Sequence, residues 1–339
     1  MVSVPRLTPD TTFADRYRVI ERIGQGAMAA VYLAEQLSTG TERALKVMDP
    51  QSLSDPKAVE RFEREARASG SIDSDHVVRV VGAGSDPKTG LLWIAQEYLP
   101  GKLLSDFLEE QPYPDTQELR EIIEQLFHAV SAAHRAGIVH RDLKPENIFL
   151  AEARRAGITH DVKVLDFGIA KILRVMDAVA TAAGLGTPLW TAPEQGTPGY
   201  VVEPSADVWA LGLIVFRLIT GRIYWRHMQP GSSAVDIAQE IIQGQIDKAS
   251  ERAVELKSPV ILLPSFDAWF AKCVHRNPRK RFVDAGQAYA ELVKAMGEMP
   301  MFDRRSERRQ KPRNPAVVAL VVVAVLAGVV AAVYLLAGW

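Results

Sequence analysis

Residues 140–147 read His140-Arg141-Asp142-Leu143-Lys144-Pro145-Glu146-Asn147, and two shorter strings follow them along the chain. Asp166-Phe167-Gly168 comes directly after a mostly apolar run, residues 162–165, and Ala192-Pro193-Glu194 comes last. Each short string alone would be common by chance, but all three in one chain point to a shared site. An aspartate that leaves a strand can offer the hard oxygen ligands that Mg²⁺ demands.

A glycine-rich turn lies upstream of these strings, between two predicted strands. Gly24-Gln25-Gly26 follows residues 17–23, and the next strand carries Val31. Glycines let the backbone approach phosphate oxygens, and main-chain N–H groups can then point at them. A strand rather than a helix follows this turn, which argues against a dinucleotide-binding fingerprint. An ordinary hairpin remains the alternative unless Lys46 lies opposite the turn.

Lys46 lies in a predicted strand, residues 43–48. Side chains alternate along a strand, so Lys46 shares a face with Ala44. A lysine on such a face is costly unless it has an anionic partner. Glu65 is a candidate partner, and Glu60 and Glu63 lie near it on the same helix, which we expect to begin at Asp55 and end near residue 70. Two solvated surface charges are the alternative.

Together these residues resemble the protein kinase family over roughly residues 17–295. The resemblance is to the eukaryotic-like Ser/Thr kinases of bacteria. It implies an α+β, bilobal protein kinase fold with a small β-rich N-lobe and a larger helical C-lobe. Helical periodicity at residues 119–130 and the apolar run at 209–219 favour the helical lobe. The expected boundaries are a tail at 1–16, a kinase domain at 17–298 (N-lobe 17–96, hinge 97–101, C-lobe 102–298), a basic juxtamembrane segment at 299–315 and one C-terminal transmembrane helix at 316–337.

The resemblance implies a catalytic role for three residues of the first string. Asp142 would accept the proton of the substrate hydroxyl, and Lys144 would neutralise the transferring phosphoryl group. Asn147 and Asp166 would hold Mg²⁺. The expected activity is therefore transfer of the ATP γ-phosphate to Ser/Thr hydroxyls of protein substrates.

The resemblance also implies a nucleotide site. Lys46 would contact the α- and β-phosphates of ATP, and Glu65 would orient Lys46. The backbone of the hinge would bond the adenine. The remaining residues expected to bind the nucleotide are Ile23, Gly24, Gln25, Gly26, Val31, Ala44, Glu97 and Leu99.

Three residues depart from what is usual in the family. Ala29 replaces the third glycine of the turn, and we expect this to reduce flexibility rather than binding. Trp190 stands where a tyrosine is usual, which would reshape the peptide pocket. Gln96 lies at the back of the nucleotide pocket, where an aliphatic side chain is more common, and we expect it to affect inhibitor fit.

Residues 169–194 correspond to an activation segment. Arg141, directly before Asp142, marks family members whose segment is ordered by a phosphate. Thr181 is the hypothesised phosphorylation site, and Thr187 resembles the threonine that bonds the catalytic aspartate and lysine.

Two later residues are expected to act structurally. Asp207 would brace the catalytic loop from the start of a buried helix. Arg281 would pair with Glu194.

Composition excludes some other classes of protein. The 339 residues are 47% hydrophobic and 24% charged, which is typical of a globular protein. The formal net charge is -1, so no global field favours nucleic acid, and we expect no nucleic-acid partner. The single cysteine, Cys273, excludes an internal disulfide. We expect a buried, inert thiol there rather than a nucleophile.

The C-terminal region favours a membrane anchor. Residues 314–339 carry no charged side chain, and residues 316–336 are almost purely Ala, Val, Leu and Gly. At about 1.5 Å per residue, that run spans a bilayer core of about 30 Å. A buried core helix is the alternative, although core helices are rarely apolar on all sides at this length.

The flanking charges predict the orientation. Residues 304–313 hold six basic residues and one acid, a local charge of +5. The positive-inside rule then keeps the kinase domain in the cytoplasm, and the cluster would contact anionic membrane lipid. The N-terminus shows no secretory signal. We therefore expect a single-pass protein of the inner cell membrane with its C-terminus outside.

Dimerisation and two rival functions stay open. Ala324, Gly328 and Ala332 have the small-residue spacing of paired spans, which would allow a homodimer, but chance explains it equally well in so alanine-rich a segment. A pseudokinase scaffold and a small-molecule phosphotransferase are the rivals. The intact Lys46 and Asp142 argue against the first, and the long activation segment argues against the second.

Overall fold

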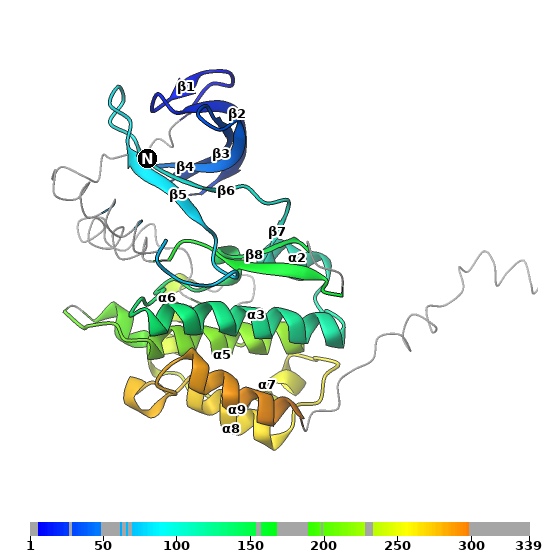
Figure 1. The fold of residues 1–339 in the computed structure, drawn as a ribbon. Helices are drawn as coiled ribbons and strands as arrows, with labels where there is room; N and C mark the ends of the chain where they lie inside the picture. Colours follow the sequence, from blue (N-terminus) through cyan, green and yellow to red (C-terminus); the bar gives the residue numbers. More distant parts are fainter. Residues whose placement is uncertain are drawn as a thin grey trace, which may run out of the picture. The chain divides into compact units, whose positions relative to one another are not determined.

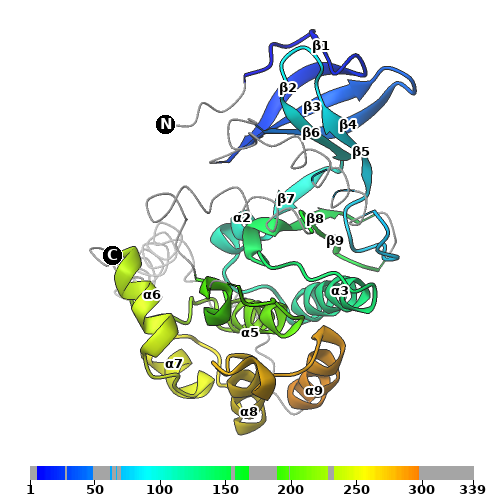
Figure 2. The same cartoon turned by 90° about the vertical axis from the view of Figure 1, so that its left-hand side faces the viewer.

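The computed structural model describes residues 6–26, 29–48, 62, 66, 70–153, 157–167, 189–197, 199–227 and 233–297. A β-sheet formed by the N-terminal residues lies on one side of a larger body of helices (Figure 1). A second, smaller sheet lies between them (Figure 2). This arrangement confirms the predicted α+β fold with a small β-rich lobe and a larger helical lobe.

The N-lobe is a six-stranded antiparallel sheet in the order β1-β2-β3-β4-β6-β5. Its two faces are packed by different residues, as the strand alternation predicts. Leu45 and Val47 pack on one face with Trp93, whereas Met48 packs on the other face against Phe62. The strands are β1 (Thr12–Phe13), β2 (Tyr17–Gln25), β3 (Ala29–Gln36), β4 (Thr41–Met48), β5 (Val80–Ser85) and β6 (Leu92–Glu97).

The sheet begins earlier than the sequence analysis expects. Residues 1–16 were expected to be a tail, but Phe13 is buried in the N-lobe core. The Leu7 N–H donates to the hydroxyl of Tyr32 at 3.0 Å, and the Ala14 N–H donates to Asp86 Oδ1 at 3.1 Å. The described part of this segment is therefore a structural part of the lobe, held by one apolar anchor and specific hydrogen bonds.

Residues 77–81 are rich in valine, which by itself favours a strand there, but the strand forms later along the chain. β5 begins at Val80, because Val77 instead forms a parallel bridge with Val164 of the small sheet. The Val78 N–H donates to the Val164 carbonyl at 3.1 Å, and the Val164 N–H donates to the His76 carbonyl at 2.9 Å. The chain thus bonds to the C-lobe before it returns to the N-lobe sheet as β5.

The C-lobe is built around α5, whose residues are all buried except Arg217. This confirms the prediction of a central buried helix from the apolar run at 209–219. The helices are α2 (Leu104–Glu110), α3 (Thr116–Arg135), α5 (Ser205–Thr220), α6 (Ala234–Gln243), α7 (Ala249–Glu255), α8 (Pro264–Cys273) and α9 (Ala285–Gly297). The small sheet has the order β7 (Gly101–Leu103), β8 (Ile148–Glu152) and β9 (His160–Val164).

Close packing of α5 against α8 depends on a glycine. A Cβ added at Gly212 would lie 2.6 Å from Cys273 Cβ, which no real pair of carbons tolerates. Cys273 itself is fully buried, and burial raises the pKa of its thiol. The prediction of a buried thiol is confirmed, and its raised pKa disfavours the reactive thiolate.

Several predictions fall outside the described residues. They are Glu65 with most of its helix, Gly168, Thr181, Thr187, the basic segment and the proposed span. Among the residues that the structure describes, no helix combines the length and apolar character needed to cross a membrane.

Candidate active site

The first string folds into a compact loop around Asp142. Pro145 opens the short 3₁₀ turn η2 (Pro145–Asn147), which bends the chain back so that Asn147 reaches Asp142. Asn147 Nδ2 donates to the Asp142 carbonyl at 2.7 Å and to Asp142 Oδ2 at 3.0 Å. Lys144 Nζ lies 2.8 Å from Asp142 Oδ2. The Asp142 side chain is 37% exposed, so its carboxylate is held in place yet open to solvent.

Asp166 lies beside this loop because β9 ends there. The Leu165 N–H donates to the Asn147 carbonyl at 2.9 Å, which fixes the end of the strand against the loop. Asp166 then takes a left-handed backbone conformation, with φ of 60°. This conformation is uncommon for a residue with a side chain and is typical of functional sites.

Lys46 connects the N-lobe to the same site. Its Nζ lies 2.6 Å from Asp166 Oδ2, and both side chains are largely buried. The structure therefore brings Lys46, Asp142, Asn147 and Asp166 together from distant parts of the chain. Glu65, the predicted partner of Lys46, lies outside the described residues, and Asp166 is the carboxylate that Lys46 contacts.

The glycine-rich turn lies next to the strand that carries Lys46. Gly24 pairs with Val31 across β2 and β3, and Val31 pairs in turn with Lys46 across β3 and β4. The Gly26 N–H donates to the Ala29 carbonyl at 2.8 Å, which closes the described part of the turn. Lys46 thus lies opposite the strand that follows the glycine-rich turn. This is the position that favours a phosphate-binding turn over an ordinary hairpin. Ile23, at the end of β2 beside the turn, is exposed.

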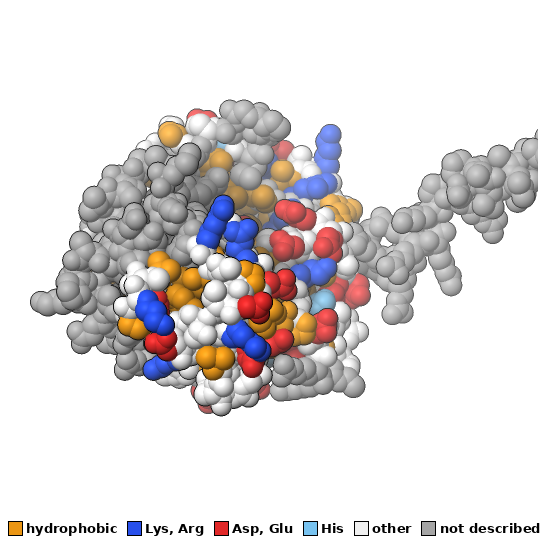
Figure 3. Space-filling view, turned by 90° about the horizontal axis from the view of Figure 1, so that it is seen from above, with side chains coloured by type: hydrophobic (Ala, Val, Ile, Leu, Met, Phe, Trp, Pro, Cys, Tyr) orange, Lys and Arg blue, Asp and Glu red, His pale blue; other side chains and the backbone are white. Residues whose placement is uncertain are grey.

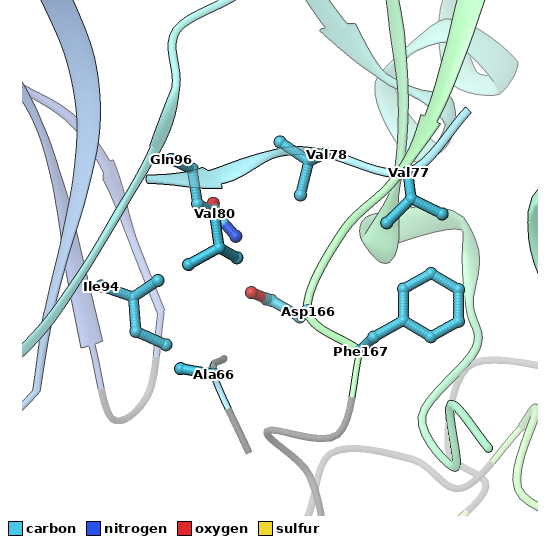
Figure 4. Close-up of a pocket in the computed structure, with 8 residues that line it drawn as sticks. All are labelled: Ala66, Val77, Val78, Val80, Ile94, Gln96, Asp166 and Phe167. Carbon is cyan, nitrogen blue, oxygen red and sulfur yellow. The ribbon is translucent and has the colours of Figure 1, made fainter. Parts of the chain in front are cut away.

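The residues at and next to the hinge differ in the hydrogen bonding and burial of their side chains. Glu97 Oε1 accepts the Arg79 N–H at 2.9 Å and lies 3.5 Å from Lys163 Nζ. The Glu97 side chain is therefore engaged by the protein, and so is its backbone N–H, which donates to the Arg79 carbonyl at 3.0 Å. Leu99 is half-buried. Gln96 is buried and lines a cavity together with Asp166 (Figure 4).

Phe149 is a candidate that the sequence analysis missed. It is half-buried on β8, and it lies on the opposite face from the buried Ile148 and Leu150. A Cβ added at Gly101, the last hinge residue, would lie 2.8 Å from Phe149 Cε1 and 2.2 Å from the Leu150 carbonyl oxygen. The ring therefore borders the hinge. Strand alternation after Asn147 was the available signal, since it places Phe149 outside the core.

Asp207, on α5, holds the catalytic loop through hydrogen bonds to the loop backbone. Its Oδ2 accepts the His140 N–H at 2.8 Å, and its Oδ1 accepts the Arg141 N–H at 2.9 Å. His134 Nε2 lies 2.9 Å from Oδ2. Burial alone would raise the pKa of Asp207, but the hydrogen bonds and charge of His134 and His140 outweigh it and lower the pKa. The predicted bracing role of Asp207 is confirmed.

His140 connects the catalytic loop to the residues that follow β9. Its Nε2 lies 2.8 Å from the Leu165 carbonyl, and its ring lies 4.7 Å from the Phe167 ring, centroid to centroid. Arg141 has a left-handed backbone, with φ of 69°. Within the described part of the chain, its Nε–H is buried without a hydrogen-bond partner.

Glu194 and Arg281 form a buried pair that confirms the sequence prediction. Two guanidinium nitrogens each lie 2.7 Å from a different Glu194 oxygen, which is the strong bidentate geometry. The other three N–H groups donate to carbonyls of Ser205, His275 and Arg276. All five donors of Arg281 are thereby used, so the buried charge is fully compensated.

The comparisons with known proteins agree with this geometry. The family described as "Protein kinase domain" matches residues 17–293. The Ser/Thr-protein kinase pkn3 of Myxococcus xanthus is 35% identical over 323 residues, covering 92% of this chain and 56% of pkn3. The Ser/Thr-protein kinase PknL of Mycobacterium tuberculosis (strain H37Rv) is 32% identical over 89% of this chain and 70% of PknL. The crystal structure of the M. tuberculosis PknI kinase domain matches with a TM-score of 0.62 and 25% identity, covering 86% of this chain and all of PknI's.

The two lobes and the site between them thus define a protein kinase domain. The chain belongs to the protein kinase family, and the curated relatives that it resembles are Ser/Thr protein kinases. It spans about half the length of the curated relatives it matches, with 56% of pkn3 and 42% of PrkC from Bacillus subtilis covered.

Replacing the Asp207 carboxylate should destabilise the C-lobe. Asp207→Asn removes the charge and turns an N–H₂ group toward backbone donors, at a cost of about 2–4 kcal/mol in the free energy of unfolding. Because folding lowers the pKa of Asp207 from 3.8, the difference from wild type should persist above that pH and shrink only below it. Urea unfolding between pH 3 and 8 measures both effects.

The exposed Asp236 in α6 offers a matched control for the chemical change. Asp236→Asn should cost clearly less than Asp207→Asn at neutral pH, about 1 kcal/mol at most, because its exposed carboxylate accepts hydrogen bonds only from Ser233 at the start of α6. Equal stabilities for Asp207→Asn and wild type would contradict the bracing role.

Proposed function

We propose that this chain is an ATP- and Mg²⁺-dependent Ser/Thr protein kinase, tethered to the inner cell membrane, that phosphorylates cytoplasmic proteins in signal transduction. The observation that carries the proposal is the convergence of Lys46, Asp142, Asn147 and Asp166. Phosphoryl transfer needs little covalent chemistry from a protein, so an enzyme of this class works by positioning and electrostatic stabilisation.

Asp142 is suited to orient the acceptor hydroxyl. Its carboxylate is half-exposed, and the Asn147 amide fixes it at one oxygen. A carboxylate held in this way can accept the proton of a Ser or Thr hydroxyl as the phosphoryl group leaves ATP. Lys144, already 2.8 Å from Asp142, supplies a positive charge next to the incoming phosphoryl group.

Asn147 and Asp166 form a donor set that suits Mg²⁺. The amide nitrogen of Asn147 is used by Asp142, which turns its oxygen toward a ligand, and Asp166 supplies a carboxylate. Mg²⁺ is commonly held by one or two such oxygen donors together with substrate phosphates. When bound, it would neutralise phosphate charge. Lys46 reaches the same place from β4, where it can clamp the α- and β-phosphates, and Glu65 as its second partner stays a prediction.

The nucleotide base would lie at the hinge. Glu97 and Leu99 would bond the adenine through their backbones, with Phe149 below and Val31 and Ala44 above. Ile23, Gly24, Gln25 and Gly26 would cover the phosphates.

Protein substrates are supported by the family and by the distribution of charge on the described surface. The described face seen in Figure 3 interleaves Lys and Arg side chains with Asp and Glu side chains. Such mixed charge suits protein partners more than the phosphate backbone of nucleic acid. The buried Glu194–Arg281 pair fixes the end of the activation segment, which favours a protein substrate over a small molecule.

Removal of the Asp142 carboxylate tests the proposed chemistry. Asp142→Asn should lower the rate of ATP-dependent phosphorylation about 100-fold or more, because the acceptor proton loses its base. Nucleotide affinity should change little, since Asp142 does not hold the phosphates. Radiolabelled ATP with the full chain in detergent measures the rate, and Asp106→Asn, on the exposed start of α2, is the control. Wild-type rates from the Asp142→Asn variant would contradict the role of Asp142, and a wild-type chain without activity would favour the scaffold alternative.

The activation segment is proposed to carry a phosphothreonine at Thr181. Arg141 supports this, because its buried Nε–H lacks a partner within the described residues and a phosphate would supply one. We propose autophosphorylation as the source of the phosphate. Thr187 would instead bond Asp142 and Lys144.

Thr181→Ala should lower both phosphate incorporation and activity, by about 10-fold in rate if the phosphate orders the segment. Mass spectrometry of the phosphopeptides and a substrate assay measure the two effects. Thr39→Ala, on an exposed N-lobe turn, is the control. An unmodified wild-type segment with full activity would remove this part of the proposal.

Membrane tethering is proposed from residues 299–339, where a basic segment precedes an uncharged apolar run long enough to span a bilayer. Pairing of two spans stays a prediction.

Deletion of residues 314–339 should move the protein from the membrane fraction to the soluble fraction, while activity remains. Carbonate extraction at high pH distinguishes a spanning segment from charge-based lipid binding, because only a spanning segment should resist it. Full-length protein that stays soluble without detergent would contradict the tether.

A further inference from the structure

A small cavity lies between the two lobes behind the Lys46–Asp166 pair. Its volume is about 10 Å³, close to the smallest that holds one water molecule. Its lining is apolar except for Gln96 and Asp166, whose polar ends both face the cavity, which is partly open (Figure 4). The lining residues are Ala66, Val77, Val78, Val80, Ile94, Gln96, Asp166 and Phe167.

The Gln96 carboxamide is the unusual feature of this cavity. Gln96 is only 8% exposed, and within the described part of the chain its side chain makes no hydrogen bond. A buried amide without a partner is costly, and such groups in native proteins are generally satisfied by protein atoms or by ordered water. The side chains of its apolar neighbours Val80 and Ile94 cannot form hydrogen bonds with the Gln96 amide.

Asp166 presents the complementary group. Its Oδ2 is bonded to Lys46, whereas its Oδ1 has no partner among the described residues. Asp166 also holds a left-handed backbone conformation, which persists only where the surrounding structure maintains it. One amide and one carboxylate oxygen are the minimum of two polar partners that a buried water requires.

We propose that this cavity holds one water molecule, which accepts a hydrogen bond from Gln96 Nε2 and donates one to Asp166 Oδ1. The water completes the hydrogen bonding of both groups. Gln96 thereby acts as a positioning residue, because it fixes the direction of the carboxylate that Lys46 contacts. The water and its effect on stability do not depend on the proposed function; only the metal readout below rests on it.

The first test uses the nucleotide-free and metal-free full chain. Gln96→Met keeps the length of the side chain and removes both polar atoms. If the water bridges the two groups, this change leaves Asp166 Oδ1 without a partner, and the melting temperature should fall by a few degrees. If the cavity is dry, the change removes an unpaired amide, and the melting temperature should rise. A rise would overturn the proposal.

Ile94→Val is the matched control, because it removes one methyl group from the same cavity and touches no polar atom. It should lower the melting temperature without any other effect. A crystal structure of the full chain gives the direct observation. Density for a water within hydrogen-bond distance of Gln96 and Asp166 supports the bridge, and an empty cavity at high resolution excludes it.

The second test measures how much Mg²⁺ gives half-maximal phosphorylation at saturating ATP. Gln96→Met should raise that concentration about 3- to 10-fold, which is the effect of one lost water-mediated bond on a ligand carboxylate. Ile94→Val should leave it unchanged, and Gln96→Asn, which keeps the amide, should lie nearer to wild type. An unchanged Mg²⁺ requirement in Gln96→Met would remove the positioning role.

The two proposals fail in different ways. A wild-type chain that is inactive but shows the water and the melting shifts would refute the kinase function alone. An active wild type with a Gln96→Met variant that matches it in metal requirement and is more heat-stable would refute the bridge alone.

Discussion

A single buried carboxylate, that of Asp207, holds the catalytic loop on the central helix of the C-lobe. It accepts the backbone N–H groups of His140 and Arg141, and His134 supplies a third contact. These bonds explain why a left-handed Arg141 persists next to Asp142. Since α5 is buried on nearly all sides, the loop is fixed to the packed core of the C-lobe, which is the kind of support that a catalytic group needs.

A continuous series of contacts connects Asp207 and the catalytic loop to the N-lobe. His140 bonds the Leu165 carbonyl, Leu165 bonds the Asn147 carbonyl, and the next residue, Asp166, contacts Lys46. The same helix supports the activation segment through Arg281, which bonds Glu194 and lies 5.0 Å from the Trp209 ring. One helix therefore positions both the chemistry and the end of the segment that would face a substrate.

The sequence predicted the parts of the site that depend on fixed spacing. Asp142 and Asn147 contact each other because a proline turn separates them, and that turn is visible in the sequence. The displaced β5 could not be predicted, because Val77 and Val81 are equally suited to a strand and only the distant Val164 selects between them. The direction of the Glu97 side chain likewise depends on Lys163, which lies far away in the chain. Phe13 shows that one aromatic residue can convert an expected tail into part of a core.

The bridge between Val77 and Val164 has a mechanical consequence. The lobes are connected at two places: the polypeptide passes between them at residues 97–101, and the segment that ends at Val78 is hydrogen-bonded to β9. Two connections, one covalent and one hydrogen-bonded, define an axis, so the lobes can turn about that line more easily than they can slide apart. Opening of the cleft to release a product would then be a swing about this line, with the largest travel at the glycine-rich turn, far from it.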